Sequence, residues 1–145
     1  MRNLKEIIMD NTNQKTSEYV EYLDLNHRYY IVIAQEKKYE DHLYDCQFTD
    51  DKGDFLEGYE GMWFDEKSFL LMEKYLFNFI DAECDLLINM YEEEYADSDK
   101  LPKIVEITKR MINNSDNKNF INLANKFLTI VEKAISLNTF VGFCF

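Results

Sequence analysis

Glu83, His27 and His42 are the side chains of this chain whose types could perform acid–base chemistry near neutral pH. Helical periodicity places Glu83 among apolar residues, so a regular helix would bury its carboxylate. A buried carboxylate is paired with a cation, protonated, or set at the mouth of a cleft. We expect a structural ion pair or hydrogen bond for Glu83, and the alternatives are a misplaced helical phase and a functional cleft. The candidate cations are Arg28, Lys109 and Arg110.

Neither histidine lies in a motif that assigns it a chemical role. His27 and His42 are outside any HExxH pattern and at no short ligand spacing from a cysteine. The sequence also lacks the GxSxG, P-loop, GxGxxG and CxxC motifs. An enzyme would need the fold to bring a histidine to Glu83, and this stays an alternative. The prediction is therefore a protein that is not an enzyme and that binds no cofactor.

The stretch Asp50-Asp-Lys-Gly-Asp54 has the acidic spacing that begins a calcium-binding loop, but two positions are wrong for one. Lys52 stands where an EF-hand needs an oxygen ligand, and Phe55 stands where it needs glycine. We therefore predict a turn and no metal site. The cysteines are odd in number, far apart and without a CxxC pair, which argues against a disulfide framework and a zinc site. They are Cys46, Cys84 and Cys144.

Negative charge is concentrated in the middle of the chain. The net charge is −12. Residues 1–38 hold six acids and six bases, residues 39–99 hold nineteen acids and three bases, and residues 100–145 hold three acids and seven bases. Glu92-Glu93-Glu94 falls near the predicted end of a long helix, where the helix dipole disfavours negative charge by about 0.3–1 kcal/mol per group. A solvated acidic face that confers solubility is one interpretation, and a docking surface for a basic partner is the other.

Two acidic sets that are separate in sequence favour the docking surface. The first lies between Glu40 and Glu66 and includes one base, and the second lies between Tyr75 and Asp99 and includes none. If the predicted hairpin around residues 50–54 lies beside the long helix, the two sets could merge into one negative field. The predicted partner-binding residues are Asp50, Asp51, Asp54, Glu57, Glu60, Asp85, Glu92, Glu93, Glu94, Asp97 and Asp99.

The charge pattern predicts an acidic inhibitor, similar in class to immunity proteins and antitoxins. It would cover the basic active or nucleic-acid-binding surface of a partner protein, in particular a toxin nuclease. No motif assigns a family, so this is analogy at the level of class. The alternatives are a DNA-mimicking anti-defence protein and a small enzyme that uses Glu83 with a histidine. Direct binding of nucleic acid is not expected, because the acidic middle repels phosphate and the C-terminal third holds only a small excess of bases.

The first half of the chain carries strand patterns. Residues 28–34 form a β-branched and aromatic run, and residues 42–49 alternate in polarity. Gly53 supplies the positive φ that a compact loop over residues 50–54 needs. Residues 55–64 then return as the partner strand of residues 42–49.

The second half carries helix patterns. Asp65 caps a helix that can run from Glu66 to about Glu93 without meeting glycine or proline. Apolar residues then repeat at helical spacing over 104–112 and again over 120–135. The tail 138–145 is too apolar to be solvated, so it should form a terminal strand or pack on the helices.

These patterns predict an α+β fold, in which a small antiparallel sheet packs on a long central helix and two further helices. An all-α fold is the alternative, if residues 16–44 are helical. A short helix over the first ten residues and a strand or helix over 19–25 complete the prediction. Residues 1–145 are expected to form a single domain, because this length supports one core comfortably. No run of about 20 apolar residues and no secretory signal is present, so we expect a cytoplasmic protein.

Overall fold

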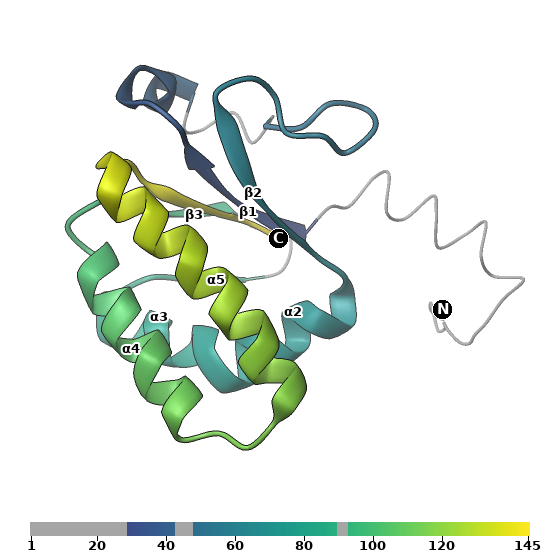
Figure 1. The fold of residues 1–145 in the computed structure, drawn as a ribbon, viewed down its shortest axis with the longest axis vertical. Coiled ribbons are helices and arrows are strands. Elements are labelled where there is room, and N and C mark those ends of the chain that lie inside the picture. Colours follow the sequence, from purple (N-terminus) through teal and green to yellow (C-terminus); the bar gives the residue numbers. More distant parts are fainter. Residues whose placement is uncertain (1–28, 43–47, 90–92) are drawn as a thin grey trace, which may run out of the picture.

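The structure is a computed structural model, in which residues 29–42, 48–89 and 93–145 are described. This part of the chain forms a four-stranded antiparallel sheet in the order β2-β1-β4-β3, with helices packed on it (Figure 1). The predicted α+β class is confirmed, and the all-α alternative is wrong. The helix expected over the first ten residues and the element expected over 19–25 lie outside the described residues.

The two central strands are almost entirely buried. Five of the six residues of β1 are buried, as are all four of β4. A run of β-branched residues such as Ile31-Val32-Ile33 suits a strand that is covered on both faces. The apolar tail of the chain forms the strand β4, which confirms one of the two structures expected for residues 138–145. The strands are β1 (Tyr29–Ala34), β2 (Tyr59–Phe64), β3 (Glu93–Ala96) and β4 (Val141–Cys144).

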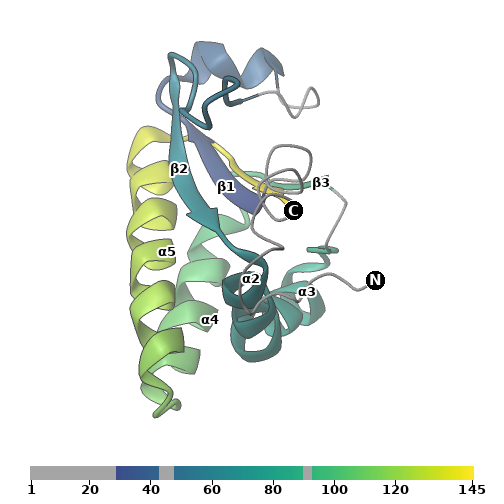
Figure 2. The same cartoon turned by 90° about the vertical axis from the view of Figure 1, so that its right-hand side faces the viewer.

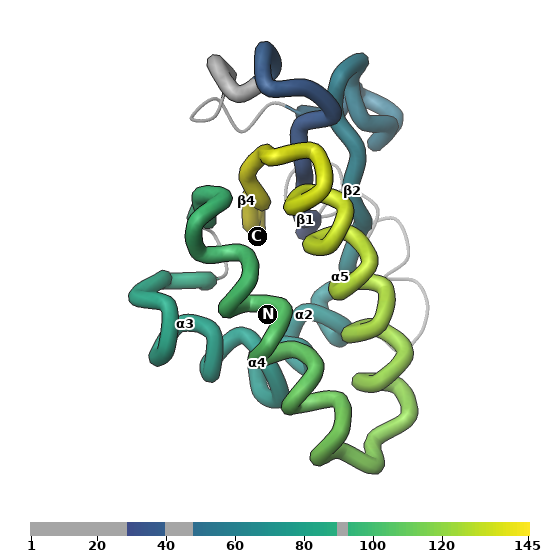
Figure 3. The backbone as a smooth tube through the Cα atoms, turned by 60° about the vertical axis from the view of Figure 1, so that its left-hand side comes forward, coloured from purple at the N-terminus to yellow at the C-terminus, as the bar shows by residue number. Residues whose placement is uncertain are grey.

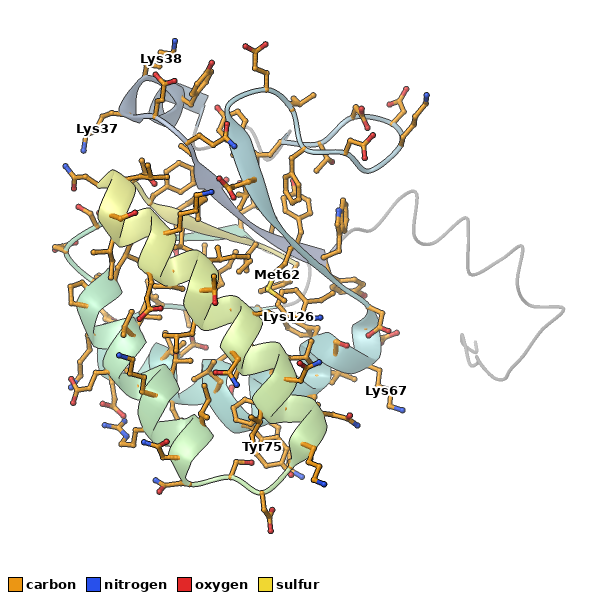
Figure 4. All side chains as sticks on the ribbon, viewed as in Figure 1. Lys37, Lys38, Met62, Lys67, Tyr75 and Lys126 are labelled. Carbon is orange, nitrogen blue, oxygen red and sulfur yellow. The ribbon has the colours of Figure 1, made fainter. Side chains whose placement is uncertain are left out.

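The helices cover one face of the sheet. α5 runs along that face with α4 beside it, and the helical run after β2 closes one end of the layer (Figure 2). Met62 points from β2 toward α5 (Figure 4). The two predicted C-terminal helices are confirmed. The helical elements are η1 (Lys37–His42), α2 (Glu66–Met72), η2 (Glu73–Phe77), α3 (Asn78–Cys84), α4 (Leu101–Asn113) and α5 (Lys118–Leu137).

Alternation along the strands divides the buried residues into two clusters. Ile31 and Ile33 point to the helices and belong to the main core, whereas Tyr30, Val32 and Ala34 point to the opposite face. After α5 the chain turns back directly into β4, which lies beside β1 at the centre of the molecule (Figure 3). The last strand of the chain therefore contributes to both clusters.

The predicted turn over residues 50–54 is confirmed. The amide of Asp50 donates to the carbonyl of Asp54 at 2.8 Å, and Gly53 has a φ of 88°. Thr49 and Phe55 form an isolated β-bridge at the base of this loop. The loop therefore closes at the residues for which Gly53 and the flanking acids predicted a turn.

The strand predicted over residues 42–49 and its pairing with residues 55–64 can be followed only at the ends of that segment. His42 lies in η1 and not in a strand, and residues 43–47 lie outside the described residues. A turn in which the amide of Tyr59 donates to the carbonyl of Leu56, with Gly58 at a φ of 92°, separates the bridge from β2. β2 pairs with β1 in antiparallel register, so the partner of β2 in the described sheet is a strand distant in sequence.

The long helix ends at Cys84 and does not continue to Glu93. Asp85 takes the left-handed conformation with a φ of 58°, and the amide of Leu86 donates to the carbonyl of Asp81 at 3.3 Å, which closes the helix. Glu93 begins β3. The extended path after Asp85 is preferred because it returns leucine and isoleucine side chains to the core, and such packing overrides helix propensity. The dipole penalty expected for the glutamate triplet therefore does not apply.

A π-helical segment, η2, changes the phase of the helical run. Its i→i+5 spacing inserts about one residue, which rotates the buried side of α3 by roughly 100°. Phe77 becomes fully buried, and Asp81 turns partly inward. Phe79 and Glu83, which a regular helix would place on the buried side, are exposed.

Phe77 lies at the centre of the main core. Its side chain has no exposed surface, and its ring meets aromatic rings from β2, α2, α5, β4 and the last residue of the chain. Ring pairs at such distances contribute beyond the burial of their apolar area. The partners and centroid distances are Phe64 at 6.3 Å, Phe69 at 6.2 Å, Phe127 at 5.7 Å, Phe143 at 5.9 Å and Phe145 at 5.6 Å.

Replacing Phe77 should therefore destabilise the whole fold. We expect Phe77→Ala to lower the free energy of unfolding by about 3–5 kcal/mol, through lost apolar burial and a cavity among the rings. Phe79→Ala is the matched control on the same helical run, because Phe79 is 41% exposed. It should cost less than about 1 kcal/mol. Urea denaturation followed by circular dichroism measures both, and equal losses would contradict the assignment of Phe77 to the centre of the core.

Candidate functional site

The predicted partner-binding residues that are described lie near β2 or near β3 in the chain, and these two strands are at opposite edges of the described sheet (Figure 1). β2 and β3 are the outer strands of the described sheet, separated by three interstrand steps, or about 14 Å. This exceeds the Debye length of about 8 Å at physiological ionic strength. The strand order therefore favours two separate negative fields over the single field that the sequence predicted. The β2-side acids are Asp50, Asp51, Asp54, Glu57 and Glu60, and the β3-side acids are Asp85, Glu93, Glu94, Asp97 and Asp99; Glu92 lies outside the described residues.

Two of the β2-side acids have structural roles. The Asp50 carboxylate accepts the amides of Lys52 and Asp54 at 2.9 and 3.0 Å, which holds the loop. Glu60 forms an ion pair with Lys133 of α5 at 2.8 Å, so it joins β2 to the helical layer. Both carboxylates are therefore engaged within the protein. Asp54 and Glu57 remain exposed at this edge.

Among the β3-side acids, Glu94 also has a structural role. One carboxylate oxygen accepts the amide of Leu87 at 2.8 Å, and the other accepts the amide of Tyr95 at 3.1 Å. Glu94 therefore joins the segment after α3 to the outer strand of the sheet. Glu93 accepts the hydroxyl of Tyr95 at 2.9 Å and stays exposed.

Asp81 holds the same segment from the opposite side. Its carboxylate accepts the amide of Ile88 at 3.0 Å. Burial raises the pKa of the Asp81 carboxyl, and the nearby carboxylates of Glu94 and Glu73 raise this pKa further, while the hydrogen bond from Ile88 opposes them. Two carboxylates thus accept consecutive amides, of Leu87 and Ile88, and repel each other while they do so.

The acids differ in whether a base neutralises them. On the helices, Glu132 pairs with Lys109 at 3.8 Å, and Glu106 pairs with Lys103 at 3.3 Å. By contrast, none of the β3-side carboxylates forms an ion pair with a described lysine or arginine. Lys100 comes near, but its ammonium donates to the backbone carbonyl of Asp85 at 3.5 Å and not to a carboxylate. The β3 edge therefore carries negative charge that no described base offsets.

Glu83 is not the buried carboxylate that the sequence predicted. Its side chain keeps 32% of its surface exposed, because η2 turns it away from the core. The expected ion pair is present: Glu83 bonds Arg110, one of the three candidate cations, and lies 3.7 Å from Lys103. This surface arrangement connects α3 to α4 and has no features of a cleft. His27 and the side chain of His42 lie outside the described residues, so the enzyme alternative gains no support.

The metal and thiol predictions can be followed only in part. Among the described residues, no group of three or more histidine, cysteine or acidic side chains could hold a metal ion. Cys84 and Cys144 are buried, and burial raises the pKa of the Cys84 thiol, which lowers its reactivity. Cys46 lies outside the described residues.

Two features of this region were missed in the sequence. No strand was predicted over Glu93–Ala96, because these residues contain no strong strand signal and the predicted helix extended to about Glu93. On a regular helix that began at Glu66, Asp81 would lie on the solvent-facing side, and the π-helical segment turns it inward. Leu86 and Ile88 are buried and Leu87 is exposed, but this alternation is absent from the sequence, in which all three residues are apolar.

Lys37 and Lys38 lie together on η1, and Lys67 and Lys126 lie apart from them on the helical side of the molecule (Figure 4). Comparison of the chain with protein-family models, with curated proteins and with solved structures gave no match. In the described part of the chain, no helix combines the length and the apolar character needed to cross a membrane.

The raised pKa of Asp81 makes stability depend on pH. Because the folded chain binds this proton more tightly than the unfolded chain, the associated stability is present at low pH and lost as pH rises through the folded pKa. Asp81→Asn removes the charge and keeps an oxygen that can accept the amide of Ile88. We expect this variant to exceed the wild type in stability at pH 7 and to lose that advantage near pH 3.5. Denaturant unfolding at both pH values, with Asp97→Asn as the control for a general loss of charge, measures the effect; an advantage that is the same at both pH values would refute it.

Substitution can separate the structural role of Glu94 from that of the β3-side acids whose carboxylates are only exposed to solvent. Glu94→Ala leaves the amides of Leu87 and Tyr95 without an acceptor and should lower the free energy of unfolding by about 1–2 kcal/mol. Asp97→Ala removes an exposed carboxylate and should change it by less than about 0.5 kcal/mol. Thermal unfolding at neutral pH compares them. If both variants lose the same stability, Glu94 does not have the structural role assigned to it.

Proposed function

We propose that this protein works by binding, as an acidic inhibitor of the class represented by immunity proteins and antitoxins. Its target would be a basic partner protein, in particular a toxin nuclease, whose active or nucleic-acid-binding surface it covers. The observation that carries this proposal is the uncompensated charge of the β3 edge, at Asp85, Glu93, Asp97 and Asp99. The Glu94 carboxylate, which accepts the amide of Leu87, adds its negative charge to this edge.

The acids of the helical layer are paired with bases and those of the β3 edge are not. This contrast supports a functional reason for the unpaired negative charge of the β3 edge. Glu83, Glu106 and Glu132, on α3, α4 and α5, each pair with a lysine or arginine of the same layer. Such surface pairs contribute only about 0–1 kcal/mol each, so stability alone exerts little pressure either way. An edge left without bases is what recognition of a cationic surface requires, because complementary charge accelerates association and rejects wrong partners.

The position of the charge on an outer strand adds a second advantage. Outer strands expose backbone groups that could pair with another chain, and charged side chains prevent such pairing. The acids of β3 therefore discourage association between copies while they attract a partner of opposite charge. In the proposed mechanism, the partner is steered to the edge by long-range attraction, and the carboxylates then lie where phosphate groups of its nucleic acid would lie.

Copurification with a matched pair of variants tests this proposal. The test variant combines Glu93→Gln, Asp97→Asn and Asp99→Asn. The control variant combines Glu36→Gln, Glu106→Gln and Glu132→Gln, which removes the same charge from other elements. We expect wild type and control to retain a basic protein from cell extract at about 50 mM salt and to release it at about 0.5 M salt. The test variant should retain much less of it.

The retained protein then serves in an activity assay. Nuclease activity should be suppressed by the wild type and by the control variant, and it should return with the test variant. Equal retention by the two variants, or retention that salt does not change, would contradict a role for the β3 edge. A retained protein that acts on other substrates would leave the binding surface in place and would correct the class of partner.

A further inference from the structure

Leu87 presents an apolar side chain to the solvent from the segment that follows α3. Leu86 and Ile88 are 5% and 1% exposed, whereas Leu87 between them is 66% exposed. Among the large apolar side chains of the described residues this fraction is the highest, and the next is that of Leu70 at 46%. A partner that covered Leu87 would remove most of a leucine from water, which favours association.

The backbone around Leu87 is held in place by the rest of the protein. The amide of Leu87 donates to the carboxylate of Glu94 at 2.8 Å, and the amide of Ile88 donates to the carboxylate of Asp81 at 3.0 Å. The amide of Leu86 donates to the carbonyl of Asp81 at 3.3 Å. Three consecutive amides are therefore bonded, and two buried side chains flank the exposed one. A side chain presented from a fixed backbone requires less ordering when it binds.

Negative charge surrounds this leucine. The Glu94 carboxylate lies at hydrogen-bond distance from its amide, and Asp85, two residues earlier in the chain, is exposed. Glu93, next to Glu94 on β3, is exposed as well. None of these three carboxylates forms an ion pair with a described base, and Lys100 reaches only the backbone carbonyl of Asp85. An apolar side chain in this setting is complementary to a surface that carries apolar and basic groups together.

We propose that Leu87 is the apolar anchor of the β3 edge, and that it docks against a basic segment of the partner protein in which apolar side chains are flanked by lysine or arginine. The apolar side chains cover Leu87, and the flanking bases meet the carboxylates around it. The inference rests on the proposed function for the basic character of the partner. It adds the point of contact, because a few buried side chains carry most of the energy of an interface, whereas charges at its rim mainly set the rate and specificity of association.

Defined peptides titrated into the full chain test this anchor. The probe is the pentapeptide KLKLK, capped at both ends, at about 20 mM salt. KSKSK keeps its charge without leucine, and ELELE keeps the leucines with opposite charge. In amide-resolved NMR spectra, we expect KLKLK to shift the signals of Leu87 and Ile88 saturably and to release at about 0.5 M salt. KSKSK should bind at least about threefold more weakly, and ELELE should not bind.

A matched pair of leucine substitutions assigns the response to one position. Leu87→Asn should raise the dissociation constant of KLKLK at least about threefold, toward that of KSKSK. Leu70→Asn, on α2, should leave it unchanged, because Leu70 is exposed but lies outside the β3 edge. Circular dichroism checks that both variants fold. Equal binding of KLKLK and KSKSK to the wild type, equal effects of the two substitutions, or binding of ELELE as tight as that of KLKLK would each overturn the anchor.

Failure of the anchor and failure of the proposed function give different results. If KLKLK and KSKSK bind equally but the variant of Glu93, Asp97 and Asp99 loses the basic partner, the inhibitor proposal stands and the anchor falls. If Leu87→Asn weakens the binding of KLKLK but the charge variant still retains the partner, the anchor stands and the role of the β3-edge charge in the proposed function falls.

Discussion

The fold depends on the burial of one aromatic ring, Phe77, at the point where all layers of the main core meet. On a regular helix that began at Glu66, this residue would sit at the margin of the apolar side. The π-helical segment η2 turns it inward, where it contacts rings from the sheet, from two other helices and from the end of the chain. A π-helical turn has poorer hydrogen-bond geometry than an α-helical one, and the burial of a whole phenylalanine side chain, about 1.5–3 kcal/mol, offsets that cost.

The same rotation determines the path of the chain beyond α3. It moves Asp81 partly inward, where its carboxylate can accept the amide of Ile88, and it moves Glu83 outward to meet Arg110. With Asp81 in that position, the segment after Cys84 is held in an extended path, and Glu94 completes the attachment from β3. The acidic outer strand therefore owes its place to a change of helical phase that occurs earlier in the chain.

Local patterns predicted much of the structure. β1, the turn over residues 50–54, α4, α5 and the C-terminal strand all follow from apolar spacing or turn chemistry that needs no tertiary context. The failures share one cause, because each depends on contacts between distant residues. Pairing of β2 with β1, termination of the long helix at Cys84 and the burial of Asp81 are set by competition for the core. The acidic residues were identified correctly as exposed in most cases, but their division between two edges follows from strand order, which one-dimensional periodicity does not contain.

The division of the acidic residues between two edges also changes how the net charge of the protein acts on a partner. A single negative field would act on a partner as a whole, whereas two acidic edges about 14 Å apart act nearly independently at physiological salt. The edges differ in chemistry as well. The β3 edge offers exposed carboxylates on an outer strand and in the turn that follows it, and the β2 edge offers exposed carboxylates in the loop that precedes the strand. A basic surface that met both edges at once would need bases at matching separation. This requirement excludes most cationic proteins. The net charge alone excludes few, because a negatively charged protein attracts any positively charged surface.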